Sequence, residues 1–95
     1  MSVHASTPEG AVTLFCRQGC RKCERIRSWL IQIGMTITLV DPSTDEEART
    51  YLLEHGFRGM PVVRTSDGRL ARGAEPEQLS AALPILDVAE RRAGA

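Results

Sequence analysis

The chain has 95 residues and a mass of 10.4 kDa, which suffices for one small domain. Its 42% of apolar and 25% of charged residues are ordinary for a folded soluble protein. Twelve basic side chains balance twelve acidic ones, and this neutral charge argues against nonspecific binding to nucleic acids or membrane surfaces. No apolar run approaches the roughly 20 residues needed to cross a bilayer, and residues 1–10 lack a secretory signal pattern. We therefore expect a cytoplasmic single domain.

The first half of the chain alternates between strand and helix patterns. Residues 11–15 (A-V-T-L-F) are short, apolar and β-prone, which predicts a buried strand. From Cys20 onward, apolar residues recur at three- and four-residue spacing, which predicts an amphipathic helix that Gly34 ends. Residues 36–40 (T-I-T-L-V) predict a second strand. The apolar stripe of the helix consists of Cys23, Ile26, Leu30 and Ile33, with Trp29 beside them.

A second helix follows the break at Asp41-Pro42. Ser43, with Glu46 three residues later, matches a capping box and predicts that Ser43 caps this helix. The helix is expected to run to about His55, with Gly56 in the left-handed position after its end. Its inward residues are predicted to be Ala48, Tyr51 and Leu52.

The remaining elements are a hairpin and a third helix. Residues 61–64 and 69–72, joined by an Asp67-Gly68 turn, predict two antiparallel strands. Pro76 fits the first turn of a helix, which Pro84 interrupts, and residues 85–92 predict further helical turns. The apolar residues of the third helix are Leu79, Ala82 and Leu83.

The element order is therefore β-α-β-α-β-β-α, an α/β fold. The strand–helix–strand unit places its two strands parallel, and the hairpin adds an antiparallel pair to the same sheet. We expect a four-stranded mixed sheet with helices on both faces. Residues 1–10 are predicted to be a flexible arm, residues 11–83 the domain, and residues 84–95 a helical tail.

Three cysteines cluster where the first strand passes into the first helix. Cys16, Cys20 and Cys23 lie within eight residues, and the chain has no other cysteine. A structural disulfide framework normally joins distant segments and uses an even number of cysteines. The cluster therefore indicates redox or metal chemistry.

Cys20 and Cys23 form a C-x-x-C motif at the start of a helix. The free N–H groups and partial positive charge of a helix N-terminus stabilise a thiolate. Arg17, Arg21 and Lys22 add positive charge around Cys20, and thiolates in such settings have pKa values of roughly 3.5–7.5. Cys23 lies on the apolar stripe and is expected to be less exposed. Cys20 is thus predicted to attack a substrate disulfide and Cys23 to resolve the mixed disulfide, and the cations favour a more oxidising disulfide.

Metal binding is the main alternative for these thiols. Zinc needs about four ligands, and the chain offers three cysteines with His4 in the arm and His55 near a helix end. The C-x3-C-x2-C spacing also resembles the iron–sulfur signature of radical S-adenosylmethionine enzymes, but those enzymes need a far larger barrel. Cys16 is either a small apolar residue ending a strand, or a thiol that is modified or forms a second disulfide with Cys20 or Cys23.

A second motif lies about forty residues after the C-x-x-C. Together, Cys20-Arg-Lys-Cys23 and Met60-Pro61-Val62-Val63 resemble the thioredoxin fold in its short glutaredoxin form. The stretch at residues 56–63 (G-F-R-G-M-P-V-V) resembles the G-F-R-x-x-P-V-V of NrdH-redoxins, and residues 72–77 (R-G-A-E-P-E) resemble their S-G-F-R-P-D. NrdH-redoxins are glutaredoxin-like proteins that take electrons from thioredoxin reductase and reduce class Ib ribonucleotide reductase.

The resemblance implies roles for the residues around the thiols. Pro61 is expected to be a cis-proline facing the cysteines, and the backbone of Met60 to hydrogen-bond the substrate chain. Gly73 is expected at the rim of the substrate groove, and Arg17 to match a basic position for glutathione or partner contact. Further partner contacts are predicted at Arg21, Lys22 and Glu75.

Departures from these families affect the expected reductant and client. The glutaredoxin G-G-x-D-D segment that holds glutathione is missing, which weakens the case for glutathione. The Phe and Arg of the NrdH segment are Ala74 and Glu75 here, and Glu75 reverses the charge at an expected partner contact.

We therefore predict a monomeric thiol–disulfide oxidoreductase that works through Cys20 and Cys23 without a bound cofactor or metal. Thioredoxin reductase is the expected reductant, and ribonucleotide reductase or another protein disulfide the expected client. The alternatives are a glutaredoxin that depends on a low-molecular-weight thiol, a metal-binding module using Cys16, Cys20 and Cys23, and a redox-regulated interaction module. The last would bind its partner through the Met60 and Glu75 rim.

Overall fold

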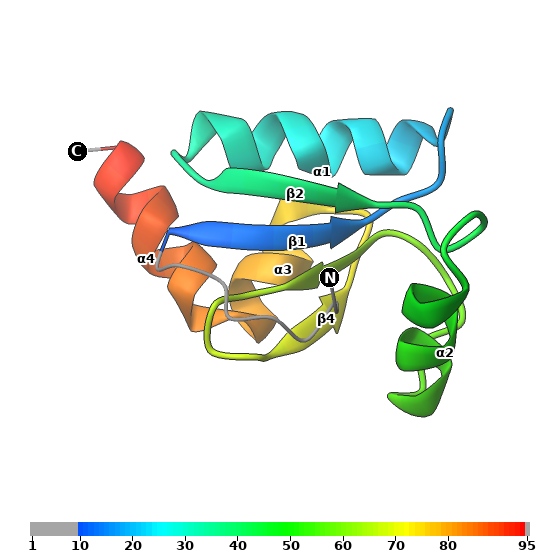
Figure 1. Ribbon diagram of the computed structural model, residues 1–95. Coiled ribbons are helices and arrows are strands. Elements are labelled where there is room, and N and C mark those ends of the chain that lie inside the picture. Colours follow the sequence, from blue (N-terminus) through cyan, green and yellow to red (C-terminus); the bar gives the residue numbers. More distant parts are fainter. Residues whose placement is uncertain (1–9, 95) are drawn as a thin grey trace.

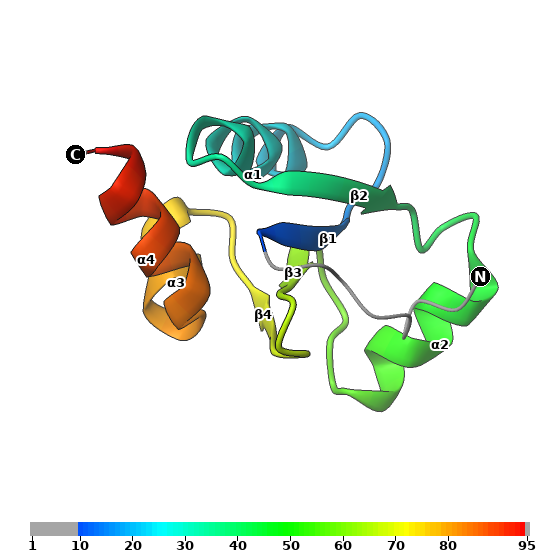
Figure 2. The ribbon, with the colours of Figure 1, turned by 60° about the vertical axis from the view of Figure 1, so that its left-hand side comes forward.

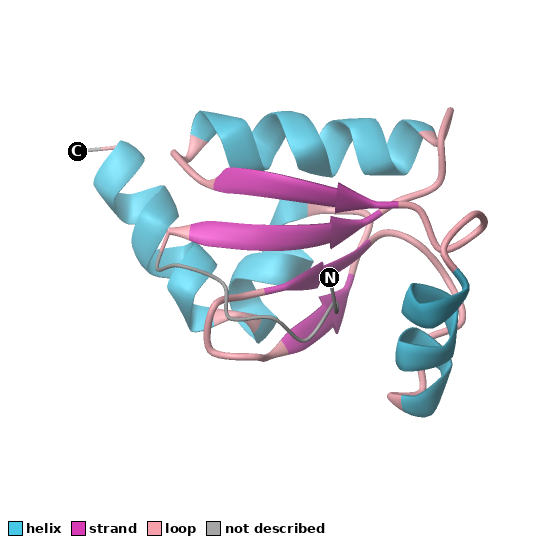
Figure 3. Ribbon diagram, viewed as in Figure 1, coloured by secondary structure: helices cyan, strands magenta, loops and turns pink. Residues whose placement is uncertain are grey.

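The computed structural model describes residues 10–94, and the predicted arm lies outside the described residues except for Gly10. Strands and helices follow the predicted order, and the segment predicted as a helical tail contains the last helix (Figures 1 and 3). The elements are β1 (Ala11–Phe15), α1 (Arg21–Gln32), β2 (Thr36–Val40), α2 (Glu46–Glu54), β3 (Val62–Arg64), β4 (Leu70–Arg72), α3 (Pro76–Ala82) and α4 (Pro84–Ala93).

The four strands form one mixed sheet in the order β2-β1-β3-β4. β1 pairs with β2 in parallel and with β3 antiparallel, and β3 pairs with β4 antiparallel. Leu14 stands opposite Leu39 on one side and Val63 on the other. The mixed sheet is thereby confirmed, because the α1 crossover imposes the parallel pair and the hairpin the antiparallel one.

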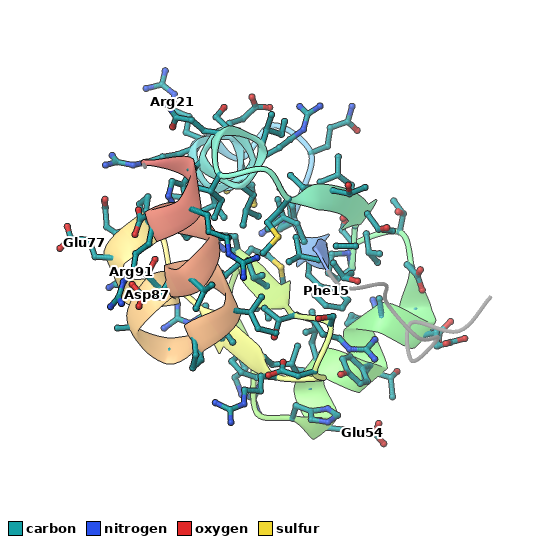
Figure 4. All side chains as sticks on the ribbon, turned by 90° about the vertical axis from the view of Figure 1, so that its left-hand side faces the viewer. Phe15, Arg21, Glu54, Glu77, Asp87 and Arg91 are labelled. Carbon is teal, nitrogen blue, oxygen red and sulfur yellow. The ribbon has the colours of Figure 1, made fainter. Side chains whose placement is uncertain are left out.

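Side chains of successive strand residues point to opposite faces of the sheet, and this divides the core in two. Val12 and Leu14 face a cluster formed with α1, α3 and α4, while Phe15 faces a smaller cluster under α2. Figure 2 shows α2 on the opposite side of the sheet from α1, α3 and α4. Figure 4 places Phe15 near the centre of the molecule, and its side chain is fully buried. Helices on both faces of the sheet are confirmed.

The boundaries of the first two strands agree with the prediction residue for residue. The predicted stripe of α1 is buried, and both Gly34 and Gly56 take positive φ angles after their helices. The hairpin strands are one residue shorter at their starts, since pairing begins at Val62 and Leu70. Proline has no N–H for a ladder, and this explains the later start of β3.

The predicted cap of α2 is wrong. Asp45, not Ser43, is the N-cap, and its carboxylate accepts a hydrogen bond from the Ala48 N–H at 3.0 Å. Ser43 instead donates its hydroxyl and its backbone N–H to the carboxylate of Asp41, at 2.6 Å and 2.9 Å. The Ser43 side chain turns back toward Asp41, and the carboxylate of Asp45 serves as the acceptor at the start of the helix.

The C-terminal tail packs on the domain as α4. Leu86 is fully buried in the larger cluster, and the carboxylate of Glu90 accepts hydrogen bonds from the Trp29 indole at 3.2 Å and the Ser80 hydroxyl at 3.3 Å. Of the apolar residues predicted for α3, Leu79 and Leu83 are buried, but Ala82 is exposed because α3 ends there. The helix at residues 84–93 therefore belongs to the same packed unit as the sheet.

Candidate active site at the start of α1

The cysteines lie on the segment that joins β1 to α1. The N–H of Cys16 donates to the Val40 carbonyl at 2.9 Å, which continues the β1–β2 ladder by one residue. The chain then turns, and the Cys20 N–H donates to the Arg17 carbonyl at 3.3 Å. Cys20 is the N-cap of α1, and its carbonyl accepts from the Glu24 N–H at 3.0 Å. The strand end and the helix start thus fix the C-x-x-C where the sequence predicts it.

The three thiols are free and differ in exposure. Cys23 is fully buried, whereas Cys16 and Cys20 are partly exposed. The Cys23 thiol influences the pKa of both other cysteines, so the three sulfurs are neighbours, and the Cys16 thiol donates to the Arg17 carbonyl at 3.6 Å. Cys23 is therefore the middle of three neighbouring sulfurs, with one accessible thiol on each side.

Hydrogen bonds at the helix start lower the pKa of Cys20. The largest contribution is the backbone N–H of Cys23, which burial opposes in part, and the Cys23 thiol lowers the pKa by a smaller amount. The backbone N–H of Lys22 and its positive charge act in the same direction. These are the unpaired donors of a helix N-terminus, and they favour the thiolate that is the reactive form of cysteine.

The other two thiols are held in the protonated form. Burial raises the pKa of Cys23 far above its ordinary value, and its hydrogen bonds to Cys16 and Cys20 raise it further. Burial likewise raises the pKa of Cys16, although its hydrogen bond to Cys23 partly offsets this effect. The reduced site thus combines one thiol of lowered pKa with two thiols of raised pKa.

The loop before β3 forms the opposite side of the site. The Met60–Pro61 peptide bond is cis, as the sequence resemblance implies, and Pro61 is buried. A groove of about 520 Å³ runs between this loop and the start of α1. We call it the Cys20 groove; its lining includes Cys20, Met60 and the cations Arg17, Arg21, Lys22 and Arg58.

The Cys20 groove is cationic. Four of its lining residues are basic and none is acidic. Figure 4 shows Arg21 projecting outward from α1, consistent with its exposed side chain. Arg58 was not singled out from the sequence, although it lies in the G-F-R stretch two residues before Met60. Its position in this motif is the signal that would have identified it.

Gly73 and Glu75 lie next to Pro61 and α1, respectively, outside the lining of the Cys20 groove. The Gly73 N–H donates to the Pro61 carbonyl at 3.2 Å, and Gly73 is buried against α3. Glu75 caps α3 and pairs with Arg25 on α1, with 2.8 Å between the carboxylate and guanidinium atoms. Neither residue lines the Cys20 groove. The structure therefore brings Arg17, Arg21, Lys22 and Met60 together with the thiols, while Gly73 and Glu75 support the neighbouring strand and helix.

Metal binding is the alternative to redox chemistry for these thiols. Within residues 10–94, no three histidine, cysteine or acidic side chains converge in a way that would hold a metal ion. The sulfurs stand in sequence, with Cys23 between the other two, and this suits exchange between neighbouring thiols.

Comparison with known proteins decides the family. The glutaredoxin family model matches residues 12–70. The chain belongs to the glutaredoxin family. Glutaredoxins are thiol–disulfide oxidoreductases, and the chain is therefore a redox protein of this class.

This glutaredoxin has relatives among phage and bacterial proteins. It is 32% identical over 77 residues to the gene 56 protein of Mycobacterium phage L5, covering 80% of this chain and 75% of the phage protein. It is 26% identical over 69 residues to the glutaredoxin-like protein NrdH of Lactococcus lactis subsp. cremoris (strain MG1363), covering 73% and 94% of the two chains.

Solved structures confirm the thioredoxin-like fold of this glutaredoxin. The NrdH-redoxin from Escherichia coli matches it with a TM-score of 0.66 and 24% identity, covering 75% of this chain and 92% of that one. None of the helices in residues 10–94 has the length and apolar character needed to span a membrane.

Proposed function

We propose that this glutaredoxin reduces disulfides in proteins through a dithiol mechanism. The Cys20 thiolate attacks one sulfur of the substrate disulfide, forms a mixed disulfide, and releases the other substrate sulfur as a thiolate. Cys23 then loses its proton and attacks the Cys20 sulfur, which frees the second substrate thiol. The substrate gains two electrons, and the protein ends with a Cys20–Cys23 disulfide. No bound cofactor or metal takes part.

The contrast between the two thiols carries this proposal. Cys20 is partly exposed with a lowered pKa, and Cys23 is fully buried with a raised pKa. An exposed thiolate attacks foreign disulfides, while a buried thiol reacts only with a sulfur brought next to it. The pair is thus suited to a nucleophilic and a resolving role, respectively.

The substrate is proposed to lie in the Cys20 groove as an extended chain. The backbone of Met60 borders this groove and would hydrogen-bond the substrate next to its disulfide. Arg17, Arg21 and Lys22 give the groove a positive charge, so acidic residues near the substrate disulfide would favour binding. Gly73 and Glu75 would act through the strand and helix that support Pro61.

Thioredoxin reductase is the proposed reductant and ribonucleotide reductase, or another disulfide protein, the proposed client. The similarity to an NrdH protein over 94% of that chain supports this assignment. The absence of the G-G-x-D-D segment argues in the same direction, because that segment holds glutathione in other glutaredoxins. We propose that the protein works as a monomer in the cytoplasm, where the thiols are kept reduced.

The test is NADPH consumption with insulin as the disulfide substrate. One arm supplies thioredoxin reductase, and the other supplies glutathione with glutathione reductase, all from the source organism. We expect turnover with thioredoxin reductase and its loss in Cys23→Ser, while Ser28→Ala, which changes an exposed hydroxyl on α1, retains it. Turnover only with glutathione, surviving Cys23→Ser, would instead assign the protein to the thiol-dependent glutaredoxins. Absence of turnover in both arms would overturn the proposal.

A further inference from the structure

A second groove lies behind the C-x-x-C motif. It has a volume of about 420 Å³ and is lined by Cys16 and Cys23, together with Glu24, Val40 and Thr44. We call it the Cys16 groove. Cys20 does not line it, and Cys16 and Cys23 do not line the Cys20 groove. The turn at residues 17–19 borders both grooves and separates them.

The position of Cys16 beside Cys23 has a structural cause. The ladder bond from the Cys16 N–H to the Val40 carbonyl holds Cys16 at the end of the sheet. Cys23 lies one turn into α1, on the buried stripe that packs against β1. The two residues line the same groove and each thiol influences the pKa of the other, while Cys16 also packs against the larger core cluster. Cys23 is fully buried and therefore shielded from an external thiol, whereas the partly exposed Cys16 lines the same groove beside it.

We propose that Cys16 is a second resolving thiol, which accepts the Cys23 sulfur and moves the disulfide from Cys20–Cys23 to Cys16–Cys23. This proposal rests on the proposed dithiol function, which generates the Cys20–Cys23 disulfide.

The exchange needs no oxidant or reductant. The Cys16 thiol gives its proton to water in the Cys16 groove, and its sulfur attacks the Cys23 sulfur. A Cys16–Cys23 bond forms, the Cys20–Cys23 bond breaks, and the electron pair leaves on Cys20 as a thiolate. One disulfide is lost and one is gained, so the oxidation state of the protein is unchanged.

The leaving group favours this direction of exchange. A thiol of lower pKa leaves more readily, and the reduced-state contacts lower the pKa of Cys20 while burial raises that of Cys16. The Lys22 charge and the N–H groups at the start of α1 remain in place to stabilise the released Cys20 thiolate. The protein would then hold a disulfide on the side of the Cys16 groove and still present a reactive thiolate in the Cys20 groove.

Such a form changes the chemistry available to Cys20. With Cys23 bound to Cys16, a mixed disulfide formed at Cys20 has no resolving partner within the protein. Its release then requires a second, external thiol, as in a monothiol mechanism. Cys16 would thus convert an oxidised dithiol protein into one that can still form mixed disulfides.

Disulfide mapping by trypsin tests the proposal, because cleavage after Arg and Lys places each cysteine on a separate peptide. Cys16 falls on peptide 1–17, Cys20 on 18–21 and Cys23 on 23–25. The reduced full chain is oxidised with one equivalent of diamide, which takes up the two electrons and two protons. The reaction is quenched in acid, and free thiols are blocked before digestion and mass spectrometry.

We expect two populations of oxidised wild-type protein. In one, peptide 18–21 is linked to peptide 23–25 by the Cys20–Cys23 disulfide. In the other, peptide 1–17 is linked to peptide 23–25 by the Cys16–Cys23 disulfide, and Cys20 is alkylated. Cys16→Ser should lose the second linkage completely. Cys20→Ser should form it within single chains.

Two results would overturn the role of Cys16 as a second resolving thiol while leaving the dithiol function intact. One is wild-type protein that forms only the Cys20–Cys23 disulfide, with Cys16 fully alkylated. The other is a Cys20→Ser variant that keeps both thiols free or joins them only between chains. Wild-type protein that forms neither linkage would overturn the dithiol function as well.

Discussion

The backbone N–H and the thiol of Cys23 both face the sulfur of Cys20 at the start of α1. The same contact has opposite effects on the two residues, because it stabilises the Cys20 thiolate and keeps the proton on Cys23. The helix start therefore prepares one thiol for attack and stores the other in protonated form. The predictions below test this arrangement and the packing that holds it.

Alkylation of the reduced protein should be selective for Cys20. The thiolate is the reacting form, so the alkylation rate of Cys20 should rise with pH until the thiol is ionised. Because the pKa of Cys20 is lowered, this rate should reach its plateau at a lower pH than that of an ordinary cysteine. Cys23 should stay unmodified over the same range because its pKa is raised and it is fully buried. Iodoacetamide labelling followed by tryptic mapping measures each site. Equal labelling of Cys20 and Cys23 at neutral pH would contradict the asymmetry.

Lys22→Gln should slow the alkylation of Cys20 at acidic pH. The positive charge of Lys22 helps to lower the pKa of Cys20, and removing it leaves less thiolate. An exposed charge pair contributes roughly 0.2–1 kcal/mol, so we expect a decrease of about 1.4- to fivefold. Arg21→Gln is the matched control and should have a smaller effect, because Lys22 is the cation that acts most on Cys20. A larger effect of Arg21→Gln would contradict this account.

Gly73→Ala should destabilise the fold without touching the thiols. A Cβ atom at Gly73 would lie 3.0 Å from the Cβ and 3.1 Å from the Oε1 of Gln78. That Oε1 accepts hydrogen bonds from two backbone N–H groups at the start of α3, so it cannot move freely. We expect a loss of about 1–3 kcal/mol in urea unfolding.

Gly94→Ala is the control for this substitution. Its Cβ would meet only ordinary contacts, at 3.6 Å and beyond, and the change should stay within about 0.5 kcal/mol. Equal effects of the two substitutions would show that the space at Gly73 is not restrictive.

Leu86→Ala should show that the C-terminal helix stabilises the domain. Leu86 is fully buried in the larger core cluster, and its truncation should cost about 2–5 kcal/mol. Val88, two residues later on α4, is 45% exposed, so Val88→Ala should change stability by no more than about 0.5 kcal/mol. Urea unfolding measures both variants. A neutral Leu86→Ala would mean that α4 adds nothing to the stability of the core.

Local sequence patterns were sufficient to predict most of the sheet and the position of the dithiol. β1 and β2 are uninterrupted apolar or β-branched runs with clear breaks, and their pairing follows from the single crossover between them. The C-x-x-C stands where the strand pattern gives way to the helical spacing of apolar residues. This position predicts a thiol at a helix N-terminus, and Cys20 is the N-cap. The N-cap residue of α2 was harder to predict, because Ser43 and Asp45 are both suitable N-cap residues. The structure shows that Ser43 instead hydrogen-bonds to Asp41.

Contacts between distant segments were not predictable in the same way. The docking of α4 depends on the Trp29–Glu90 hydrogen bond, which joins residues 61 positions apart. The position of Arg58 in the Cys20 groove depends on how the loop before β3 meets the start of α1. The contact between Cys16 and Cys23 likewise needs the register of β1 against the helix.

Trapping the mixed disulfide tests the central claim most directly. Reduced Cys23→Ser and Cys20→Ser proteins are each mixed with a disulfide substrate such as insulin, quenched in acid and analysed by mass spectrometry. We predict that Cys23→Ser accumulates an adduct with the substrate on tryptic peptide 18–21, which contains Cys20, and that Cys20→Ser forms none. An adduct of Cys20→Ser on peptide 23–25, with none on Cys23→Ser, would reverse the proposed roles of the two thiols and contradict the account.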